Sequence, residues 1–315
     1  MSSSFSDILP HSSLFQNLRT PAKKLTKDKP NLHALMIDLR GHGASPADGI
    51  APSSSAPPLS SSSSLSSSHE YSHPTINNCA NDVIHTAQAL NLTGSSSPIG
   101  IVGHSFGGRC ALTYHHTLCT KGDVNPDTDK ETVVNPPHHC FILDSVPGTA
   151  HASVDHVLRA IENVPIPIAS KKDLVQFLTQ DQNVSKAIAH WMTTNLRSYD
   201  DQSASTGGNK GGFEFTFDMS VARGVLDNFP QQDMLQMIRD CVSISDADSG
   251  NRTIHKIMAS KTGTWTEEMV DELEEIQSDH YDDRLKLVTL DAGHWVHIDD
   301  LEGLMVALRA GFDGR

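Results

Sequence analysis

Residues 99–108 read Ile-Gly-Ile-Val-Gly-His-Ser-Phe-Gly-Gly, an apolar run that ends abruptly in a Gly-x-Ser-x-Gly motif. A stretch of helical character, residues 109–114, follows this motif. This pattern is typical of a nucleophile elbow, a sharp turn between a strand and a helix that lifts a serine above a sheet. The serine of such a turn has a strained backbone, and glycines two residues away on either side relieve the crowding. The stretch therefore favours a nucleophilic Ser105 over a plain glycine-serine turn.

Length and composition limit the number of domains, the partners and the compartment that the chain can have. The chain has 315 residues, enough for one large α/β domain or two small ones. Its formal net charge of −14 argues against nucleic acid or an anionic membrane surface as a partner. Five cysteines without paired spacing do not resemble a disulfide framework, which favours a reducing compartment.

The sequence also bears on localisation. No apolar run approaches the roughly 20 residues of a membrane span, so no stable membrane insertion is expected. The first residues have no apolar core of a secretory signal; they are rich in serine and weakly resemble an organelle transit peptide. We expect residues 1–13 to be a disordered tail and the protein to be intracellular, in the cytoplasm or in an organelle.

Strands alternate with helices along the chain, which predicts a mostly parallel sheet flanked by helices. A helix is expected over 14–27, and a buried strand over 33–37 that ends in the turn Asp38-Leu39-Arg40-Gly41-His42-Gly43. Another helix is expected over 75–92. Later strands are expected at 140–143, 254–259 and 285–290, and helices at 267–277 and 300–311.

Two stretches interrupt this alternation. Residues 44–73 are rich in Ser, Pro and Ala and predict a disordered insert, because they offer too little apolar surface to offset ordering. Residues 151–245 have mainly helical periodicity and predict a helical cap over the active site. The domain prediction is a core of residues 14–150 and 246–315, interrupted by this cap.

A serine hydroxyl needs a general base, and His294 is the best placed of 18 histidines. In the chain order serine, acid, histidine, the base lies on a loop after the last strand. His294 follows the predicted strand 285–290 by a short Asp-Ala-Gly turn and precedes the closing helix. The other histidines near turns, His42, His104 and His297, lack this position.

Three motifs together resemble the α/β-hydrolase family: Asp38 to Gly43, Val102 to Gly108, and Asp291 to His297. They are most similar to short-capped esterases of the alpha/beta-hydrolase domain-containing protein 11 type. The resemblance implies the α/β-hydrolase fold and hydrolysis of a small-molecule ester or thioester, with neither metal nor organic cofactor. It assigns Ser105 as nucleophile and His294 as base. The adjacent His104 and Trp295 are expected to contact substrate.

The acid of the triad has two candidates. The loop after the penultimate strand, residues 260–265, is the usual place but holds no carboxylate. Asp144 follows the strand 140–143, and so reaches the same edge of the sheet as Ser105. Asp218 follows the strand-like run 213–217 and also matches an aspartate in relatives. We favour Asp144, with Asp218 as the alternative.

The oxyanion hole is predicted only in part. The N–H of Phe106, the residue after the nucleophile, is one expected donor. The second normally comes from a His-Gly motif that precedes Asp38, and neither that motif nor its strand is found, so the N-terminal strands of the family fold are expected to be missing. Loss of one donor costs about 2.7–4 kcal/mol of transition-state stabilisation. A non-catalytic ligand-binding or interaction protein with an incomplete oxyanion hole is therefore the alternative function.

Other patterns favour plainer interpretations. The pairs His115-His116 and His138-His139 are expected to be polar surface rather than metal ligands. No Gly-Lys-Ser/Thr follows the glycines at 100–107, which argues against a phosphate-binding loop. The sequence leaves the acyl chain length and the oligomeric state open.

Overall fold

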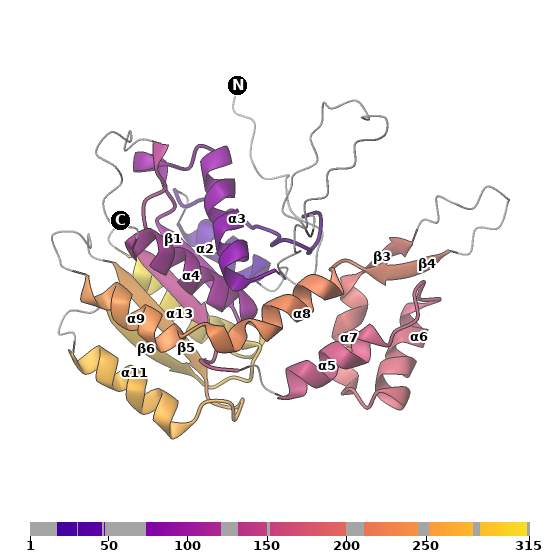
Figure 1. Cartoon of the computed structure of the whole chain (residues 1–315). Coiled ribbons are helices and arrows are strands. Elements are labelled where there is room, and N and C mark those ends of the chain that lie inside the picture. Colours follow the sequence, from indigo (N-terminus) through magenta and orange to yellow (C-terminus); the bar gives the residue numbers. More distant parts are fainter. Residues whose placement is uncertain are drawn as a thin grey trace, which may run out of the picture.

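The computed structural model describes residues 18–29, 31–45, 47, 74–120, 132–149, 152–199, 211–244, 252–279 and 284–313 (Figure 1). The tail predicted at 1–13 lies outside these residues. So does the insert predicted at 44–73, apart from residues 44, 45 and 47.

The molecule is organised around a four-stranded sheet with the order β1-β2-β5-β6, in which all neighbouring strands are parallel. These strands are β1 (Gly100–His104), β2 (His139–Leu143), β5 (Thr253–Ala259) and β6 (Leu285–Leu290). Every residue of β2 is buried, as expected for a central strand covered on both faces. The predicted parallel sheet with flanking helices is confirmed.

Helices cover both faces of the sheet. On one face Cys140 and Ile142 pack with α4 (Phe106–Thr120), α9 (Met234–Ser243) and α11 (Glu267–Asp279). Helix α3 (Ile76–Ala89) packs against α4, and the short 3₁₀ turn η2 (Gly94–Ser96) follows it in the chain.

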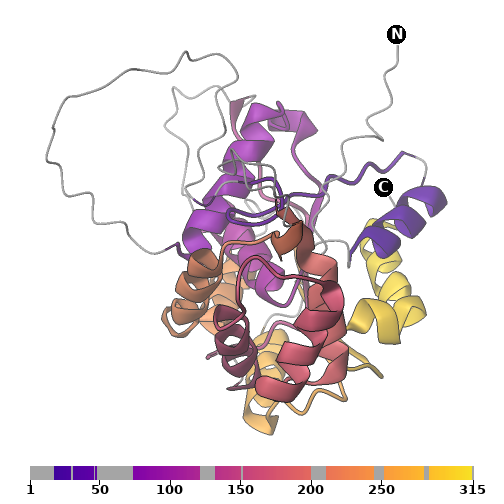
Figure 2. The same cartoon turned by 90° about the vertical axis from the view of Figure 1, so that its right-hand side faces the viewer.

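On the other face Phe141 and Leu143 pack with α13 (Leu301–Phe312), which follows the short α12 (Val296–Asp299). Helix α2 (Arg19–Asp28) lies beside α13 (Figure 2) and forms two ion pairs with it, Lys24–Glu302 and Asp28–Arg309.

The prediction of a strand over residues 33–37 is wrong. Residues 32–39 have no assigned strand pairing, and Leu35 is 54% exposed. Because an isolated extended segment leaves its backbone N–H and C=O groups without ladder partners, apolar residues alone do not make a strand. The turn that follows still packs on the core through the buried Leu39 and His42.

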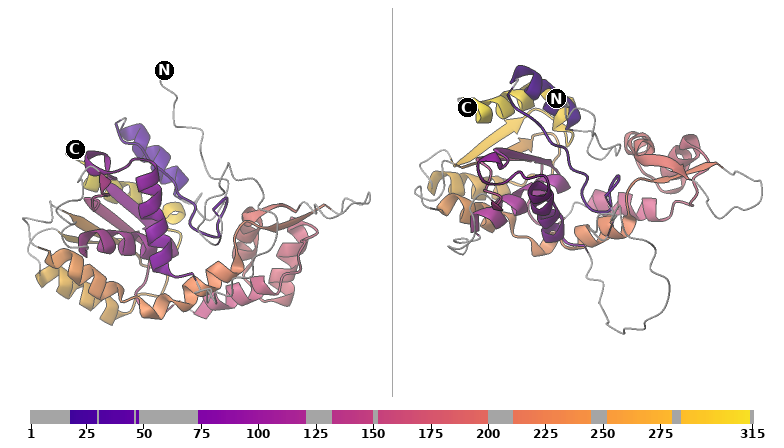
Figure 3. Two further views of the ribbon diagram at one scale, coloured as in Figure 1. Left: turned by 45° about the horizontal axis from the view of Figure 1, so that its top comes forward. Right: turned by 90° about the horizontal axis from the view of Figure 1, so that it is seen from above.

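Elements between β2 and α9 form a separate lobe, which stands to one side of the sheet (Figures 1 and 3). Its buried residues, including Leu174, Leu178 and Met192, form their own core. The lobe comprises α5 (Ala152–Glu162), α6 (Lys171–Gln176), the π-helical turn η4 (Phe177–Asp181), α7 (Lys186–Met192), the 3₁₀ turn η5 (Thr193–Asn195), the antiparallel pair β3 (Leu196–Tyr199) and β4 (Gly212–Phe215), and α8 (Met219–Asp227).

Helix α8 connects this lobe to the sheet domain. Its first residue, Met219, packs in the lobe, whereas Val221 and Val225 pack against Leu39 and Ile76 of the sheet domain. After the 3₁₀ turn η6 (Phe229–Gln231), α9 lies against the sheet. The lobe with its own core therefore ends before α9, although the cap was expected to extend to residue 245.

Among the residues that the structure describes, no helix combines the length and the apolar character needed to cross a membrane.

Candidate active site

Ser105 occupies a tight turn between β1 and α4. Its φ angle is 53°, in the left-handed region that non-glycine residues rarely adopt, and its N–H donates to the carbonyl of Leu143 at 2.9 Å. A Cβ on Gly103 would lie 2.0 Å from the carbonyl oxygen of Gly107, so no side chain fits there. Gly103 therefore has a steric cause, but the same expectation for Gly107 is wrong, because a Cβ there would meet nothing within 4 Å. Ser105 stands at the carboxyl end of the sheet.

His294 and Asp144 meet at the same edge. The Nδ1 of His294 lies 2.7 Å from Oδ2 of Asp144. Asp144 directly follows β2 and has a φ angle of 40°, while His294 follows β6 through the turn at 291–293. The Asp144 side chain is fully buried, whereas that of His294 is 41% exposed. The carboxylate therefore holds the imidazole through Nδ1 while part of the His294 side chain stays accessible.

The carboxylate of Asp144 is held by two further donors. Its Oδ1 accepts from Nε1 of Trp265 at 2.7 Å and from the N–H of Ala259 at 3.1 Å. Burial opposes ionisation, but the hydrogen bonds from His294, Trp265 and Ala259 together lower the pKa of Asp144 below its usual value. A carboxylate with these partners is ionised at neutral pH and orients the His294 imidazole through Nδ1.

Trp265 comes from the loop at 260–265, which lacks a carboxylate. This loop supplies a hydrogen-bond donor, Trp265, to the acid Asp144, which directly follows the neighbouring strand β2. No role for Trp265 is predicted from the sequence, in which its one signal is its place in the loop where the family's acid is expected.

Asp218 has a different position. It is the N-cap of α8, where its Oδ1 accepts from the N–H of Ser220 at 2.8 Å and from the Ser220 hydroxyl at 2.6 Å. Burial raises its pKa, but these hydrogen bonds outweigh that effect and lower it. The structure thus pairs Asp144, and not Asp218, with His294.

His104 contacts the backbone of His294. Its Nε2 lies 2.7 Å from the His294 carbonyl oxygen, and the two imidazole rings are 4.6 Å apart between centroids. Burial, together with the neighbouring charge of His294, lowers the pKa of His104 to about 3. The ring is therefore neutral, and its Nε2–H donates to that carbonyl. The expected contact of His104 with substrate remains a prediction.

Trp295 links the sheet domain to the lobe. Its ring lies 5.6 Å from His104 and 5.0 Å from Trp191 of α7, measured between centroids. Two indoles from distant parts of the chain therefore meet beside His294. Apolar surface at this place suits the apolar part of a small molecule.

Phe106 is the first residue of α4, where backbone N–H groups have no partner within the helix. Its ring lies 6.2 Å from that of His42, which comes from the turn at 38–43 and also stacks near Phe217 at 6.3 Å. The turn at 38–43 therefore lies next to the start of α4.

A buried lysine lies beneath the acid, and no feature of the sequence distinguishes it. The Nζ of Lys256 donates to the carbonyl of Ser145 and lies 5.1 Å from the centre of the Trp265 ring. Burial lowers the pKa of Lys256 to about 7, although nearby Asp144 opposes that shift. Lys256 therefore contacts both segments that position the Asp144 carboxylate.

Comparison with known proteins agrees with this fold. A model of the alpha/beta hydrolase family matches residues 4–305, and the chain belongs to this family. The predicted fold class is confirmed. No curated protein matches the sequence.

Solved structures with a similar fold have low sequence identity. The enol-lactonase from Burkholderia xenovorans LB400 is 12% identical, with 95% of this chain and 86% of that chain covered and a TM-score of 0.54. The N-formylmaleamic acid deformylase from Pseudomonas putida S16 is 13% identical, with coverage of 94% and 86% and a TM-score of 0.51. E-2-(acetamidomethylene)succinate hydrolase is 14% identical, with coverage of 79% and 78% and a TM-score of 0.51. At this identity the likeness concerns the fold alone.

Proposed function

We propose that the protein is a serine hydrolase that cleaves a carboxylic ester or thioester through an acyl-enzyme. Ser105 is the nucleophile, His294 the general base and Asp144 the acid that orients it. The hydrogen bond of 2.7 Å between His294 Nδ1 and Asp144 Oδ2 carries the proposal. It holds the imidazole in the tautomer whose Nε2 is free to accept a proton.

In the first half of the reaction, Nε2 of His294 takes the proton of Ser105 as its Oγ attacks the carbonyl carbon. The negative charge that develops on the carbonyl oxygen is stabilised by the Phe106 N–H at the positive end of α4. The intermediate expels the alcohol or thiol, which takes the proton from His294. Water then attacks the acyl-serine, gives a proton to His294 and releases the carboxylic acid, and Ser105 regains its proton.

Several observations support a small-molecule acyl substrate. Trp295 and Trp191 form apolar surface next to His294, and we assign Trp295 and His104 to the substrate side of the site. The motifs that resemble short-capped esterases include Ser105 and His294. The solved relatives carry the names of hydrolases, one of them a lactonase. The chemistry needs no metal or organic cofactor.

A fluorophosphonate probe tests the proposal directly, because it reacts with activated serines. We expect the wild-type protein to be labelled at Ser105 and to hydrolyse p-nitrophenyl and thioester substrates. S105A and H294A should lose both properties while keeping the wild-type circular dichroism spectrum. The matched control is S260A, an alteration of a serine on the same edge of the sheet, which should be labelled normally.

Absence of labelling in folded wild-type protein would contradict the proposal. The alternative, a ligand-binding member of the family with an incomplete oxyanion hole, would then replace it. Labelling that persists in S105A would assign the nucleophile elsewhere.

A further inference from the structure

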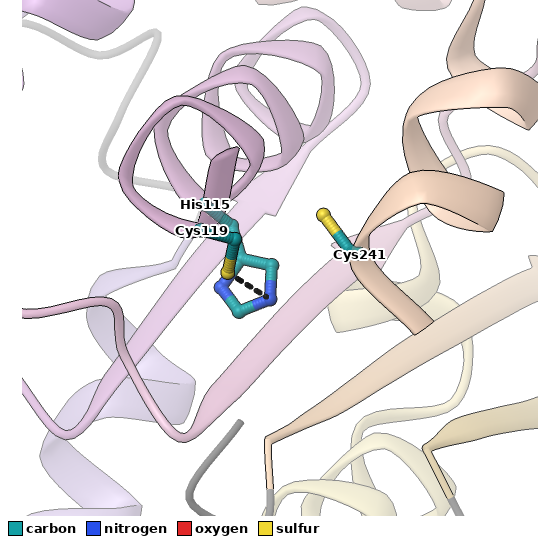
Figure 4. A group of neighbouring side chains, drawn as sticks. All are labelled: His115, Cys119 and Cys241. Atoms are coloured by element: carbon teal, nitrogen blue, oxygen red, sulfur yellow. Dashed lines mark hydrogen bonds between the residues drawn. The ribbon is translucent and has the colours of Figure 1, made fainter. Parts of the chain in front are cut away.

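A cluster of soft metal-ligating side chains lies at the far end of α4 (Figure 4). His115 and Cys119 are four residues apart on this helix, and Cys241 comes from α9, which packs beside it. One potential ligand atom of each residue lies within 4.8 Å of those of the other two. His115 and Cys241 are buried, Cys119 is half-buried, and both thiols are free.

The spacing of the donors fits tetrahedral coordination. His115 Nε2 lies 3.6 Å from Cys119 Sγ. Zinc–sulfur and zinc–nitrogen bonds of 2.3 and 2.0–2.1 Å at a tetrahedral angle place the two donors about 3.5 Å apart. Only small rotations of side chains are therefore needed to aim the three donors at one ion, and a fourth position remains for water.

The charges around the cluster are also compatible with a cation. His115 and Cys119 are in the last two turns of α4, where the helix dipole is negative. Asp240 adjoins Cys241 and bonds His116 at 2.9 Å. Arg252 Nη1 lies 3.9 Å from Cys119 Sγ, and its positive charge opposes a cation at this place. Two thiolates would balance a divalent ion, and their protons would be released to solvent on binding.

We propose that His115, Cys119 and Cys241 bind one thiophilic divalent cation of the Zn²⁺ type, which joins α4 to α9. The prediction of polar surface for His115-His116 and His138-His139 is wrong for His115 and His139, which are buried. The sequence could not show the partner of His115, because Cys241 comes from a helix distant in the chain. The site is separate from the proposed reaction: Cys119 is 13 residues along α4 from Phe106, about 20 Å at 1.5 Å per residue. Its role is structural.

Cobalt substitution provides the test. Reduced, full-length protein is titrated with Co²⁺ without oxygen, and then with Zn²⁺. We expect one equivalent of Co²⁺ to give thiolate charge-transfer absorption and the intense visible bands of a tetrahedral site, and Zn²⁺ to abolish both. C119S, C241S and H115A should lose these bands. C79A is the matched control: it removes another buried cysteine and should leave the bands unchanged.

Three results would overturn the proposal: no tetrahedral cobalt bands in folded wild-type protein, bands that persist in C119S and C241S, or an equal loss in C79A. A second readout covers variants that fold poorly. Zn²⁺ should raise the thermal midpoint of the wild type and of C79A, but not that of H115A, and an equal rise in all three would also contradict the site.

Discussion

The two ends of α4 differ in how their side chains are brought together. At its first turn, Ser105, Asp144 and His294 stand at the ends of β1, β2 and in the loop after β6, where parallel topology brings strand ends to one edge. At its last turns, His115 and Cys119 meet Cys241 only because α9 packs against the helix. The helix dipole is positive at the first end, which suits an oxyanion, and negative at the second, which suits a cation.

The two ends of α4 also differ in how completely their polar groups are hydrogen-bonded. The acid at the first end has hydrogen bonds to both carboxylate oxygens. At the second end, the buried Nδ1 of His115 has no hydrogen-bond partner in the structure as described. The first end thus has a fully organised acid, whereas at the second end the nitrogen proposed as metal donor is Nε2, which faces Cys119 Sγ at 3.6 Å.

The largest effect is expected for D144N. The amide keeps the shape but favours the wrong imidazole tautomer, so kcat should fall about 10⁴-fold. D218N is the control, because Asp218 caps α8; its kcat should stay within a few-fold of the wild type. Initial rates with a p-nitrophenyl ester measure both. A large loss in D218N with none in D144N would transfer the role of acid to Asp218.

A smaller loss is expected for W265F, which removes the indole donor to Asp144 Oδ1. A hydrogen bond to a charged group contributes about 1.5–3 kcal/mol, so kcat should fall roughly 10- to 100-fold with little change in KM. W191F is a matched control: Nε1 of Trp191 has no partner in the described structure, and this variant should alter KM rather than kcat. Equal effects of both variants on kcat would argue against a positioning role for Trp265.

The buried Lys256 should make stability depend on pH. Its pKa is about 7 in the folded protein and near 10.4 when unfolded, so the unfolded chain binds more protons between these values. Stability from this group therefore rises with pH, on the order of 2 kcal/mol between pH 7 and pH 9. Urea unfolding of K256M should lack that rise, whereas K261M, at an exposed lysine, should retain it. Identical pH slopes in wild type and K256M would contradict the prediction.

The smallest effect is expected when the two ends are tested together. Sites about 20 Å apart without shared partners behave almost independently. Zn²⁺ at one equivalent should therefore change the thermal midpoint of the wild type but alter kcat/KM by less than about twofold. C119S provides the zinc-insensitive reference. A larger zinc-dependent change in the wild type alone would show that the two ends of α4 are coupled.

The sequence by itself determined the local features of this protein. The glycine pattern around Ser105, the apolar strand runs and the place of His294 after the last strand all follow from neighbouring residues, because steric crowding and side-chain periodicity act locally. The same local reasoning predicts a strand over residues 33–37, where the run is apolar but pairs with no other strand.

Only the tertiary structure decided which groups meet. Asp144 and Asp218 both follow strand-like runs, but only Asp144 follows a strand of the sheet that also carries the His294 loop. Trp265, Lys256 and Cys241 have no local signature either, since each acquires its role from a partner far away in the chain. Sheet register and helix packing supply these contacts, and no short stretch of sequence encodes them.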